Sequence, residues 1–566
     1  MRTACVVFAI VMLLGGATAT GRGGVPRAGD ASTARTVEVR VPGVAVGEKV
    51  GVGALRHWRA WLIRQGYAVD RCGVSLAWGS LVVDIDDPAD VQRLTDAGFT
   101  VLREWTPAPL RGAALTDPQY FTPAEIGAML LQVATDHPAI AARFAIGTTH
   151  EGRPIWAIEI SDHPRVDEDE PAIQFNGQHH AREVATSHVV MDVVTTLTNG
   201  YGVDPQITAW VNAYKTVCVP MVNPDGVDYV FNFNSLWRKN RQTYPPNCVG
   251  VDLNRNYPYL WGPGCGSSGV CSSNIYRGPS VASEIETQAL IGLTQTYHFT
   301  MATSYHSFGR LIDYPYACSD GSPAGRMPEH AVIDEMMNGV ADAIDAVDGV
   351  PRYTVFSPVP LGGVNGDDTS WYYAHMGAYP FIIEVGTSFE PAFSAVAGIV
   401  NRNRAGWQHM YQRLGQARID VHVTAQCAPT IATVELTDFV YDTGELPRQT
   451  TLPFGRWSYI VPANAGYTVR ASRPGFVTRQ VTVSVGNAPA FVDIDLHPFS
   501  LPTTPVGDMD QNCIVNGADI PGFTTALLAG ADPAQIVLGD FTRDCLIDLA
   551  DLPPFVAALL NGDTCP

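Results

Sequence analysis

The sequence predicts a multidomain protein centred on an α/β domain, with a mixed, mostly parallel sheet sandwiched by helices. Between 119 and 415, apolar segments typical of buried strands alternate with segments typical of helices, which favours such a sheet. The chain has 566 residues, too many for a single hydrophobic core. We therefore expect three further units: an α+β unit at 36–111, a small β-sandwich at 417–498 and an EF-hand-like helical tail at 505–566.

The first residues have the features of a secretory signal peptide. Arg2 is followed by an apolar run at 6–14 and by the small residues Ala17-Thr18-Ala19. The apolar run is too short to span a bilayer. We expect residues 1–19 to be removed and the protein to be secreted, either extracellular or at the cell surface, without a membrane span.

Charge and cysteine content narrow the possible functions. With 36 Lys and Arg against 56 Asp and Glu, the formal net charge is −20, and phosphates would be repelled. Nucleic acid is therefore not an expected partner. Of eleven cysteines, Cys5 leaves with the signal peptide, and the remaining ten are expected to form disulfides in an oxidising compartment. No C-x-x-C pair occurs, so a cysteine zinc site is not expected.

The unit at 36–111 combines strand and helix patterns. TVEVRV and SLVVDI alternate like strands, whereas LRHWRAWLIRQG, ending at Gly66, and PADVQRLTDAG have the apolar spacing of helices. Its place ahead of the large domain suits an inhibitory or folding prosegment. An unrelated small domain is the alternative.

In the central domain, PAIQFN, TVCVPMV, FTMATSYHSF and PFIIEV are predicted strands. A helix is predicted from Arg182 to Thr198, ended by Asn199-Gly200, and Asn223-Pro224-Asp225-Gly226 is a predicted turn. After Ala417, short alternating runs separated by turns predict the β-sandwich. The tail follows the linker SLPTTPV and contains an internal repeat, VNGADIPGFTTALLAG and IDLADLPPFVAALLNG.

A metal site is indicated by His180-x-x-Glu183, between a predicted strand and a predicted helix. A spacing of three places both side chains on one face of a helical turn, where they can bind one ion. His179 is an alternative ligand by sequence alone, although Glu183 would then lie one residue further along. His306 ends an apolar strand, and open α/β sheets place their sites at the carboxyl edge of strands.

Two imidazoles and one carboxylate around a tetrahedral zinc leave one position for water, which is the catalytic arrangement. Zinc lowers the pKa of such a water towards about 7, and a base must take its proton. Glu384 closes the hydrophobic strand PFIIEV, and burial would suit it to move a proton. Taken singly, each residue has an ordinary structural explanation, such as a core histidine or an ion-paired glutamate.

Together these motifs resemble the zinc carboxypeptidase family, of the carboxypeptidase A type, over 119–415. The resemblance rests on HARE, LWRKNR, VDLNRN, SYHS and the strand-end glutamate, all in family order. It implies one catalytic zinc held by His180, Glu183 and His306, with Glu384 as general base and acid.

The resemblance also implies roles for residues that contact the substrate. Arg238 would hold the oxyanion, and Asn254 and Arg255 would bind the free C-terminal carboxylate, a role that suits a planar guanidinium. The other substrate-binding residues are predicted to be Arg182, Ser307 and Thr369. A disulfide between Cys248 and Cys271 is implied as well.

The sequence departs from the family pattern over the substrate site. Gly362 falls where the family has a mobile tyrosine, and Tyr372 or Tyr373 is the candidate replacement. Phe308 replaces the usual tyrosine after SYHS. Side-chain preference is set near Thr369, and the neighbouring Asp367-Asp368 points to a mixed or basic preference.

Two acidic loops in the tail have calcium-binding spacing. Positions 1, 3, 5, 9 and 12 are oxygen-bearing in both copies, which lie 32 residues apart, and each leads into a short apolar helix. The residues are Asp508, Asp510, Asn512, Asn516 and Asp519 in the first loop, and Asp540, Thr542, Asp544, Asp548 and Asp551 in the second.

The duplicated loops resemble a type I dockerin, so two Ca²⁺ ions and a cohesin-type scaffold are the implied partners. Cys513 and Cys545 stand where such loops normally have glycine, and they are candidates to pair with each other or with Cys565. The polar recognition pair is replaced by Gly517-Ala518 and Leu549-Ala550.

The expected function is a secreted zinc metallocarboxypeptidase that hydrolyses the C-terminal peptide bond of peptides and proteins. Two alternatives stay open. One is a related zinc amidase acting on cell-wall or modified peptides, because Gly362 loosens the site. The other is a non-catalytic, calcium-dependent binding protein on a peptidase-like scaffold.

Overall fold

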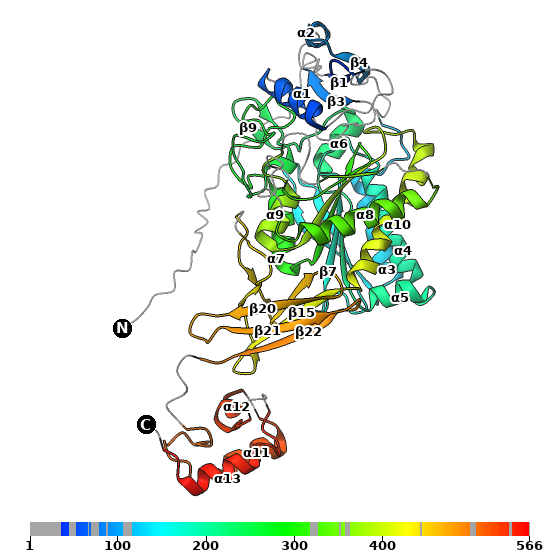
Figure 1. Cartoon of the computed structure of the whole chain (residues 1–566). Coiled ribbons are helices and arrows are strands. Elements are labelled where there is room, and N and C mark those ends of the chain that lie inside the picture. Colours follow the sequence, from blue (N-terminus) through cyan, green and yellow to red (C-terminus); the bar gives the residue numbers. More distant parts are fainter. Residues whose placement is uncertain are drawn as a thin grey trace, which may run out of the picture.

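A computed structural model describes the chain from residue 35 to residue 564, with gaps. The described residues are 35–44, 52–65, 67–69, 79–85, 89–105, 116–316, 318, 327–349, 353–356, 363–441, 444–498, 505–531, 533–542 and 546–564. Figure 1 shows the successive units in chain order, from the blue N-terminal unit to the red C-terminal helices. The predicted signal peptide, Gly362, Asp544, Cys545 and Cys565 lie outside the described residues.

The N-terminal unit is a four-stranded antiparallel sheet with two helices. Its strands have the order β2-β3-β1-β4, and its helices are α1 (Val52–Arg64) and α2 (Ala89–Asp96). The strands are β1 (Arg35–Arg40), β2 (Ala68–Val69), β3 (Ser80–Ile85) and β4 (Thr100–Trp105). Strand alternation directs Leu81 and Val83 into the core of this unit and leaves Val82 and Asp84 on the other face of β3.

The central domain contains a mixed sheet of eight strands, in the order β13-β12-β14-β11-β7-β8-β6-β5. The four central strands, β14, β11, β7 and β8, are parallel, whereas β5 and β6 at one edge and β12 at the other are attached by antiparallel pairing. The bounds are β5 (Ala141–Thr148), β6 (Pro154–Ile160), β7 (Ala172–Gly177), β8 (Lys215–Val219), β11 (Met301–Ser307), β12 (Leu311–Asp313), β13 (Thr354–Phe356) and β14 (Tyr379–Val385). The predicted mixed α/β sheet is thus confirmed.

Helices lie on both sides of this sheet (Figure 1). Helix α10 packs against α4 and α8, and α7 contacts α9. The bounds are α3 (Pro123–Asp136), α4 (Thr186–Gly200), α5 (Pro205–Val211), α6 (Pro224–Asn232), α7 (Ile285–Tyr297), α8 (His330–Ala346), α9 (Asp368–Met376) and α10 (Val396–Leu414). The predicted helix start at Arg182 is wrong: residues 180–185 form turns closed by i→i+3 hydrogen bonds, and α4 begins at Thr186.

Residues 418–496 form two four-stranded sheets around a common apolar core. One sheet contains β15 (Arg418–Ala425), β16 (Ala428–Pro429), β19 (Arg456–Ile460) and β22 (Ala490–Leu496). The other contains β17 (Thr433–Leu436), β18 (Arg448–Gln449), β20 (Ala465–Ser472) and β21 (Arg479–Val485). The tail has helices α11 (Ile520–Ala529), α12 (Pro533–Gly539) and α13 (Leu552–Asn561).

Disulfides link loops of the central domain. The expected pair Cys248–Cys271 is present, and a second bond joins Cys265 to Cys318. Cys427 and Cys513 each take part in a further disulfide. Cys218, in β8, is free and buried. In the part of the chain that the structure describes, no helix has the length and apolarity that crossing a membrane requires.

Candidate active site

His180 and Glu183 lie on the turn between β7 and α4. The turn is closed by a hydrogen bond from the Glu183 N–H to the His180 carbonyl, at 3.2 Å. His180 Nδ1 consequently lies 2.7 Å from Glu183 Oε1. A turn thus achieves the convergence that the sequence predicted for one face of a helix.

His306 joins this pair from the neighbouring strand β11. Its Nδ1 atom lies 3.0 Å from Glu183 Oε2 and 3.1 Å from His180 Nδ1. The Ser307 N–H donates to Glu183 Oε2 at 3.1 Å, which orients the carboxylate. All three side chains are at most 2 % exposed, and one ligand atom from each lies within 4.8 Å of the others.

The hydrogen-bond partners of the two Nε2 atoms, in His180 and His306, indicate that the Nδ1 atoms are available to bind a cation. His180 Nε2 faces Asp252 Oδ1 at 3.1 Å, and His306 Nε2 faces Ser304 Oγ at 3.1 Å. A proton on each Nε2 leaves both Nδ1 lone pairs directed towards the Glu183 carboxylate and towards each other. Two imidazoles and a carboxylate match the catalytic zinc ligand set, and their outer hydrogen bonds match the usual support of such ligands.

The charge state of the cluster also suits a metal. Burial raises the pKa of Glu183, but His180 and His306 outweigh burial and hold this pKa well below its ordinary value. Burial lowers the pKa of His306 to about 4, even though Glu183 opposes this change. His306 and Glu183 are therefore in the forms that bind metals at neutral pH. Burial and Arg238 lower the pKa of His180, but Glu183 and Asp252 outweigh them and raise it, so a bound cation would displace a proton from this imidazole.

Asp252 is the central residue that the sequence reasoning missed. Its carboxylate accepts hydrogen bonds from the Asn254 N–H at 3.0 Å and from Arg238 Nε at 3.0 Å, besides its contact with His180. Burial raises the pKa of Asp252, but Arg238 and Arg255 outweigh burial and hold it well below its ordinary value. Its place immediately before LNRN was the one available signal.

Glu384 lies beside the cluster on β14. In the parallel pairing of β11 and β14 it is the register partner of His306. Paired residues of adjacent strands point to the same face of a sheet. Glu384 is only 1 % exposed, as expected of a strand-end carboxylate in a closed site.

The predicted substrate-binding residues surround this centre and are buried. Arg255 Nε and Nη1 donate to the carbonyls of Gly266 and Asn254, at 2.9 and 2.7 Å. Asn254 Oδ1 accepts from the Asp368 N–H at 2.9 Å, so the Asn254 amino group faces away from α9. Arg238 Nη1 lies 3.9 Å from Glu183 Oε1. The three side chains thus lie around one carboxylate network.

Arg182 and Thr369 lie further out. The Arg182 guanidinium stacks on Phe389 at 3.9 Å and lies 3.7 Å from Asp84 of the N-terminal unit. The Thr369 hydroxyl donates to Asp367 Oδ2 at 2.8 Å, so it belongs to the N-terminal cap of α9.

Tyr372 and Tyr373 do not replace the mobile tyrosine, so this suggestion was wrong. Both rings are at most 1 % exposed. The Tyr373 hydroxyl donates to Glu329, and Tyr372 packs between Trp371 and Tyr257. Side chains fixed in this way cannot close over a substrate.

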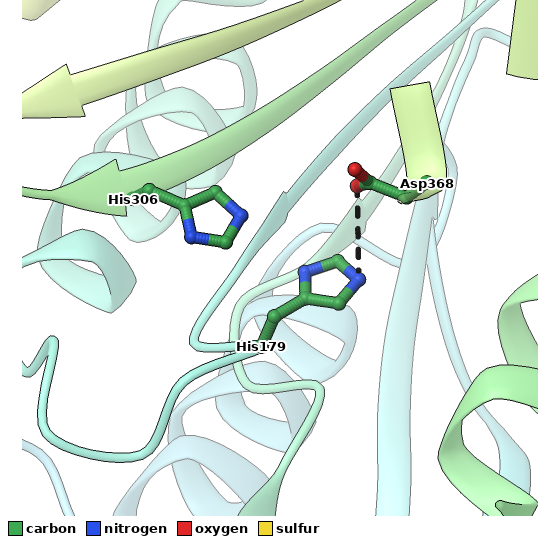
Figure 2. A group of neighbouring side chains, drawn as sticks. All are labelled: His179, His306 and Asp368. Carbon is green, nitrogen blue, oxygen red and sulfur yellow. Dashed lines mark ion pairs between the residues drawn. The ribbon is translucent and has the colours of Figure 1, made fainter. Parts of the chain in front are cut away.

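A third histidine, His179, adjoins the cluster. His179 is fully buried, and its ring stacks on that of His306 with centroids 5.6 Å apart. Figure 2 shows His179 between His306 and Asp368, whose Oδ2 atom lies 3.7 Å from His179 Nε2. His179 therefore faces α9, whereas His180 faces Glu183.

In the tail, the structure gathers part of the predicted calcium set. Carboxylate oxygens of Asp508, Asp510 and Asp519 lie within 4.8 Å of one another. Asp519 accepts from the N–H of Asp510 at 3.0 Å and of Asn516 at 2.8 Å. In the second loop, Asp551 accepts from Phe541, Thr542 and Asp548 in the corresponding way.

The chain is similar in sequence to known carboxypeptidases. Residues 126–404 match the model of the family described as zinc carboxypeptidase. Metallocarboxypeptidase A of Arthroderma otae is 37% identical over 231 residues, 40% of this chain and 53% of that protein. Carboxypeptidase A2 of Mus musculus is 26% identical over 357 residues, 62% of this chain and 76% of that protein.

Among solved structures, carboxypeptidase A from Helicoverpa armigera matches with a TM-score of 0.54 and 20% identity. That match covers 67% of this chain and 96% of the other, and it supports the fold. The chain spans about half the length of the Arthroderma protein.

Proposed function

From the match of residues 126–404 to the zinc carboxypeptidase family, we propose that this protein is a secreted zinc metallocarboxypeptidase. It hydrolyses the C-terminal peptide bond of peptides and proteins. The observation that carries the proposal is the convergence of His180, Glu183 and His306, with Glu384 adjacent on the next strand. Secretion rests on the signal-peptide features of residues 1–19.

In this proposal His180, Glu183 and His306 would hold zinc, which would supply a Lewis acid for the scissile carbonyl and a water molecule. Glu384 takes the proton of the attacking water and returns it to the leaving amine. Arg238, anchored on Asp252, stabilises the negative charge that develops on the carbonyl oxygen. The anchoring matters because a pre-oriented guanidinium need not reorganise during the reaction.

Asn254 and Arg255 bind the free carboxylate of the substrate. The Arg255 guanidinium is oriented by the carbonyls of Gly266 and Asn254, and Asn254 is oriented by the Asp368 N–H. A fixed guanidinium beside an amide group favours a planar anion. Such recognition restricts cleavage to the last peptide bond. Asp367 and Asp368 beside Thr369 favour a mixed or basic terminal residue.

The N-terminal unit acts as an inhibitory prosegment in this proposal. Val82 packs with Phe308 and Phe389, and Asp84 faces Arg182 at 3.7 Å, so one face of β3 covers the predicted outer subsite. Leu311, directly after the zinc-ligand strand, belongs to the apolar core of the N-terminal unit. Substrates would reach the cluster after this unit is displaced.

A peptide panel tests the activity. Protein freed of residues before about 119 should release C-terminal amino acids from peptides, and chelators should stop the release. C-terminally amidated peptides should resist cleavage, since they lack the carboxylate that Asn254 and Arg255 bind. Equal cleavage of amidated and free peptides would favour the amidase alternative. Stoichiometric zinc without turnover would favour the binding protein.

We further propose that the tail binds two Ca²⁺ ions. The support is the matched hydrogen bonding of Asp519 and Asp551, which places the last carboxylate of each loop against the backbone N–H of position 9. A cohesin-type scaffold is the proposed partner. Side chains of one face of α13 and its preceding loop are exposed, which suits docking: Leu549 75%, Leu552 38%, Val556 43% and Leu560 82%.

A further inference from the structure

The buried polar network behind His306 contains a second imidazole, that of His179. Ser304 Oγ contacts three groups: His306 Nε2 at 3.1 Å, His179 Nδ1 at 3.3 Å and Asn176 Oδ1 at 2.9 Å. On its far side, His179 Nε2 lies 2.9 Å from the Tyr257 hydroxyl. Each of these five side chains is at most 2 % exposed, so none of them can rely on water.

The hydrogen atoms of this network can be assigned from its geometry. A serine hydroxyl has one hydrogen and can accept two hydrogen bonds. The Ser304 hydrogen points to the carbonyl oxygen of Asn176. Ser304 Oγ then accepts from both imidazoles, namely from His306 Nε2–H and from His179 Nδ1–H. The unprotonated His179 Nε2 accepts from the Tyr257 hydroxyl.

The metal-facing nitrogen of His306 is unprotonated in this arrangement. A proton on His306 Nε2 leaves its Nδ1 lone pair directed at His180 and Glu183. Ser304 can receive that proton only if its own hydrogen points elsewhere. Asn176 and His179 together impose this orientation on Ser304, because one attracts its hydrogen and the other occupies its second lone pair.

We propose that His179 is a positioning residue for the zinc ligand His306, acting through Ser304. The inference rests on the proposed zinc site. His179 holds the Ser304 hydroxyl in the orientation that fixes the His306 tautomer, and Tyr257 in turn fixes His179. Hydrogen bonds to metal-ligating histidines typically contribute 10–100-fold to metal affinity or activity.

A second metal ion between His179, His306 and Asp368 is the competing explanation of Figure 2. It would require lone pairs on His179 and on the second nitrogen of His306. The Tyr257 hydroxyl already donates to the lone pair of His179 Nε2, and His306 Nε2 carries a proton and has no lone pair to offer. A second metal ion is therefore disfavoured, and metal stoichiometry distinguishes the two explanations.

The network also reaches the carboxylate-binding residues. Asp368 faces His179, and its backbone N–H holds Asn254. The Asn254 Nδ2 atom lies 3.4 Å from His306 Nε2, and both are N–H groups in this arrangement, so the His306 proton goes to the closer Ser304 Oγ at 3.1 Å. His179 thus lies between the zinc ligand and the start of α9. Its loss should affect zinc binding more than substrate binding, because Asn254 keeps its own hydrogen bond to Asp368.

The test uses the full chain and four variants. His179→Leu removes the donor, His179→Asn restores an amide donor near the Nδ1 position, and Tyr257→Phe removes one hydroxyl. His188→Leu is the matched control, since His188 is another interior histidine, stacked on Phe121 at 3.8 Å. Zinc dissociation constants are measured by chelator competition, zinc per chain by metal analysis, and ligand geometry by the visible spectrum of the cobalt(II) form.

We expect about 10–100-fold weaker zinc binding and an altered cobalt spectrum for His179→Leu, near-normal binding for His179→Asn and His188→Leu, and an intermediate loss for Tyr257→Phe. Unchanged zinc affinity in a folded His179→Leu variant would overturn the proposal. So would two zinc ions per wild-type chain with one lost on substitution. A wild-type chain without zinc would overturn the proposed function itself, and this proposal with it.

Discussion

His306 and Glu384 are directly paired residues on the adjacent parallel strands β11 and β14. A gap of 78 residues in the sequence is therefore reduced to the spacing of neighbouring strands, about 4.8 Å. The metal-facing imidazole and the proposed proton carrier occupy the same sheet face because parallel pairing imposes it. Zinc binding by His306 and proton transfer by Glu384 can therefore be tested separately, by substituting one residue of the pair at a time.

Glu384→Gln should abolish turnover while zinc stays bound. The amide keeps the shape of the carboxylate but cannot take a proton, and general base catalysis contributes about 10²–10⁴-fold. Steady-state hydrolysis of a free-terminus peptide and zinc analysis of the same sample check this. A variant that loses its zinc would instead make Glu384 a metal ligand.

Asp252→Asn should weaken zinc binding and catalysis together. The substitution removes the negative charge that faces His180 Nε2 and that anchors Arg238. Loss of such a carboxylate partner typically costs 10–100-fold in metal affinity. Chelator competition and kcat measurements check the expectation. Asp228→Asn, on α6, is a suitable control, because Asp228 pairs with Arg153 and not with the cluster. Equal zinc affinity in Asp252→Asn and wild type would contradict the assigned support.

Val82→Glu should increase the activity of the uncleaved chain. A carboxylate at this position would lose its hydration against the rings of Phe308 and Phe389, which disfavours the covered arrangement. Each 1.4 kcal/mol of destabilisation corresponds to a tenfold population shift, so an increase of about tenfold or more is expected. Peptide hydrolysis by the intact chain measures it. Gln92→Glu, on the exposed face of α2, should have no effect. A silent Val82→Glu variant would argue against inhibition by this unit.

Glu286→Gln should change how stability depends on pH. Burial raises the pKa of Glu286 to about 7, although hydrogen bonds including that from Asn240 lower it. The folded state therefore holds a proton that the unfolded state has lost between about pH 4.5 and 7. Its contribution to stability is fully present below pH 4.5 and is lost as pH rises through 7.

The raised pKa of Glu286 corresponds to a change in the free energy of unfolding on the order of 3 kcal/mol. Thermal melts of wild type and Glu286→Gln between pH 4.5 and 8 should diverge in slope, with wild type losing more stability as pH rises. Parallel curves would show that Glu286 titrates normally. Because Glu286 accepts from Asn240, which also receives the Val251 N–H, the same titration acts on the loop that carries Arg238.

Asp519→Ala should reduce the calcium stoichiometry from two to one. The substitution removes the carboxylate that accepts from the Asp510 and Asn516 N–H groups, and the second loop is left intact. Calorimetric titration of the full chain with Ca²⁺ measures the number of sites. Asp563→Ala, an exposed position outside both loops, is the control. Two sites persisting in Asp519→Ala would contradict the loop assignment.

Local patterns in the sequence were sufficient to predict the strands and to single out candidate residues. Apolar runs predicted the strands that became β7, β8, β11 and β14, because buried strands need side chains of that kind on both faces. The order of HARE, LNRN and SYHS indicated the zinc carboxypeptidase domain that 126–404 match. Motifs of this kind are legible because the chemistry restricts which residues can stand there.

Other features depended on contacts between distant residues. Asp252 meets His180 across 72 positions, and Asp84 meets Arg182 across 98, and neither pairing has a local signature. The start of α4 was missed because a turn and a first helical turn place residues three apart in similar positions. Tyr372 and Tyr373 were misjudged because burial, which immobilises a ring, is decided by packing.

The sequence by itself determined which chemical groups are available and in which order they occur. The tertiary structure alone decided which of them converge, which nitrogen of each imidazole faces the cluster, and that His179 stands behind His306 instead of beside Glu183. The reason is physical: tautomer and orientation are set by hydrogen-bond partners, and those partners are brought together only by strand register and packing.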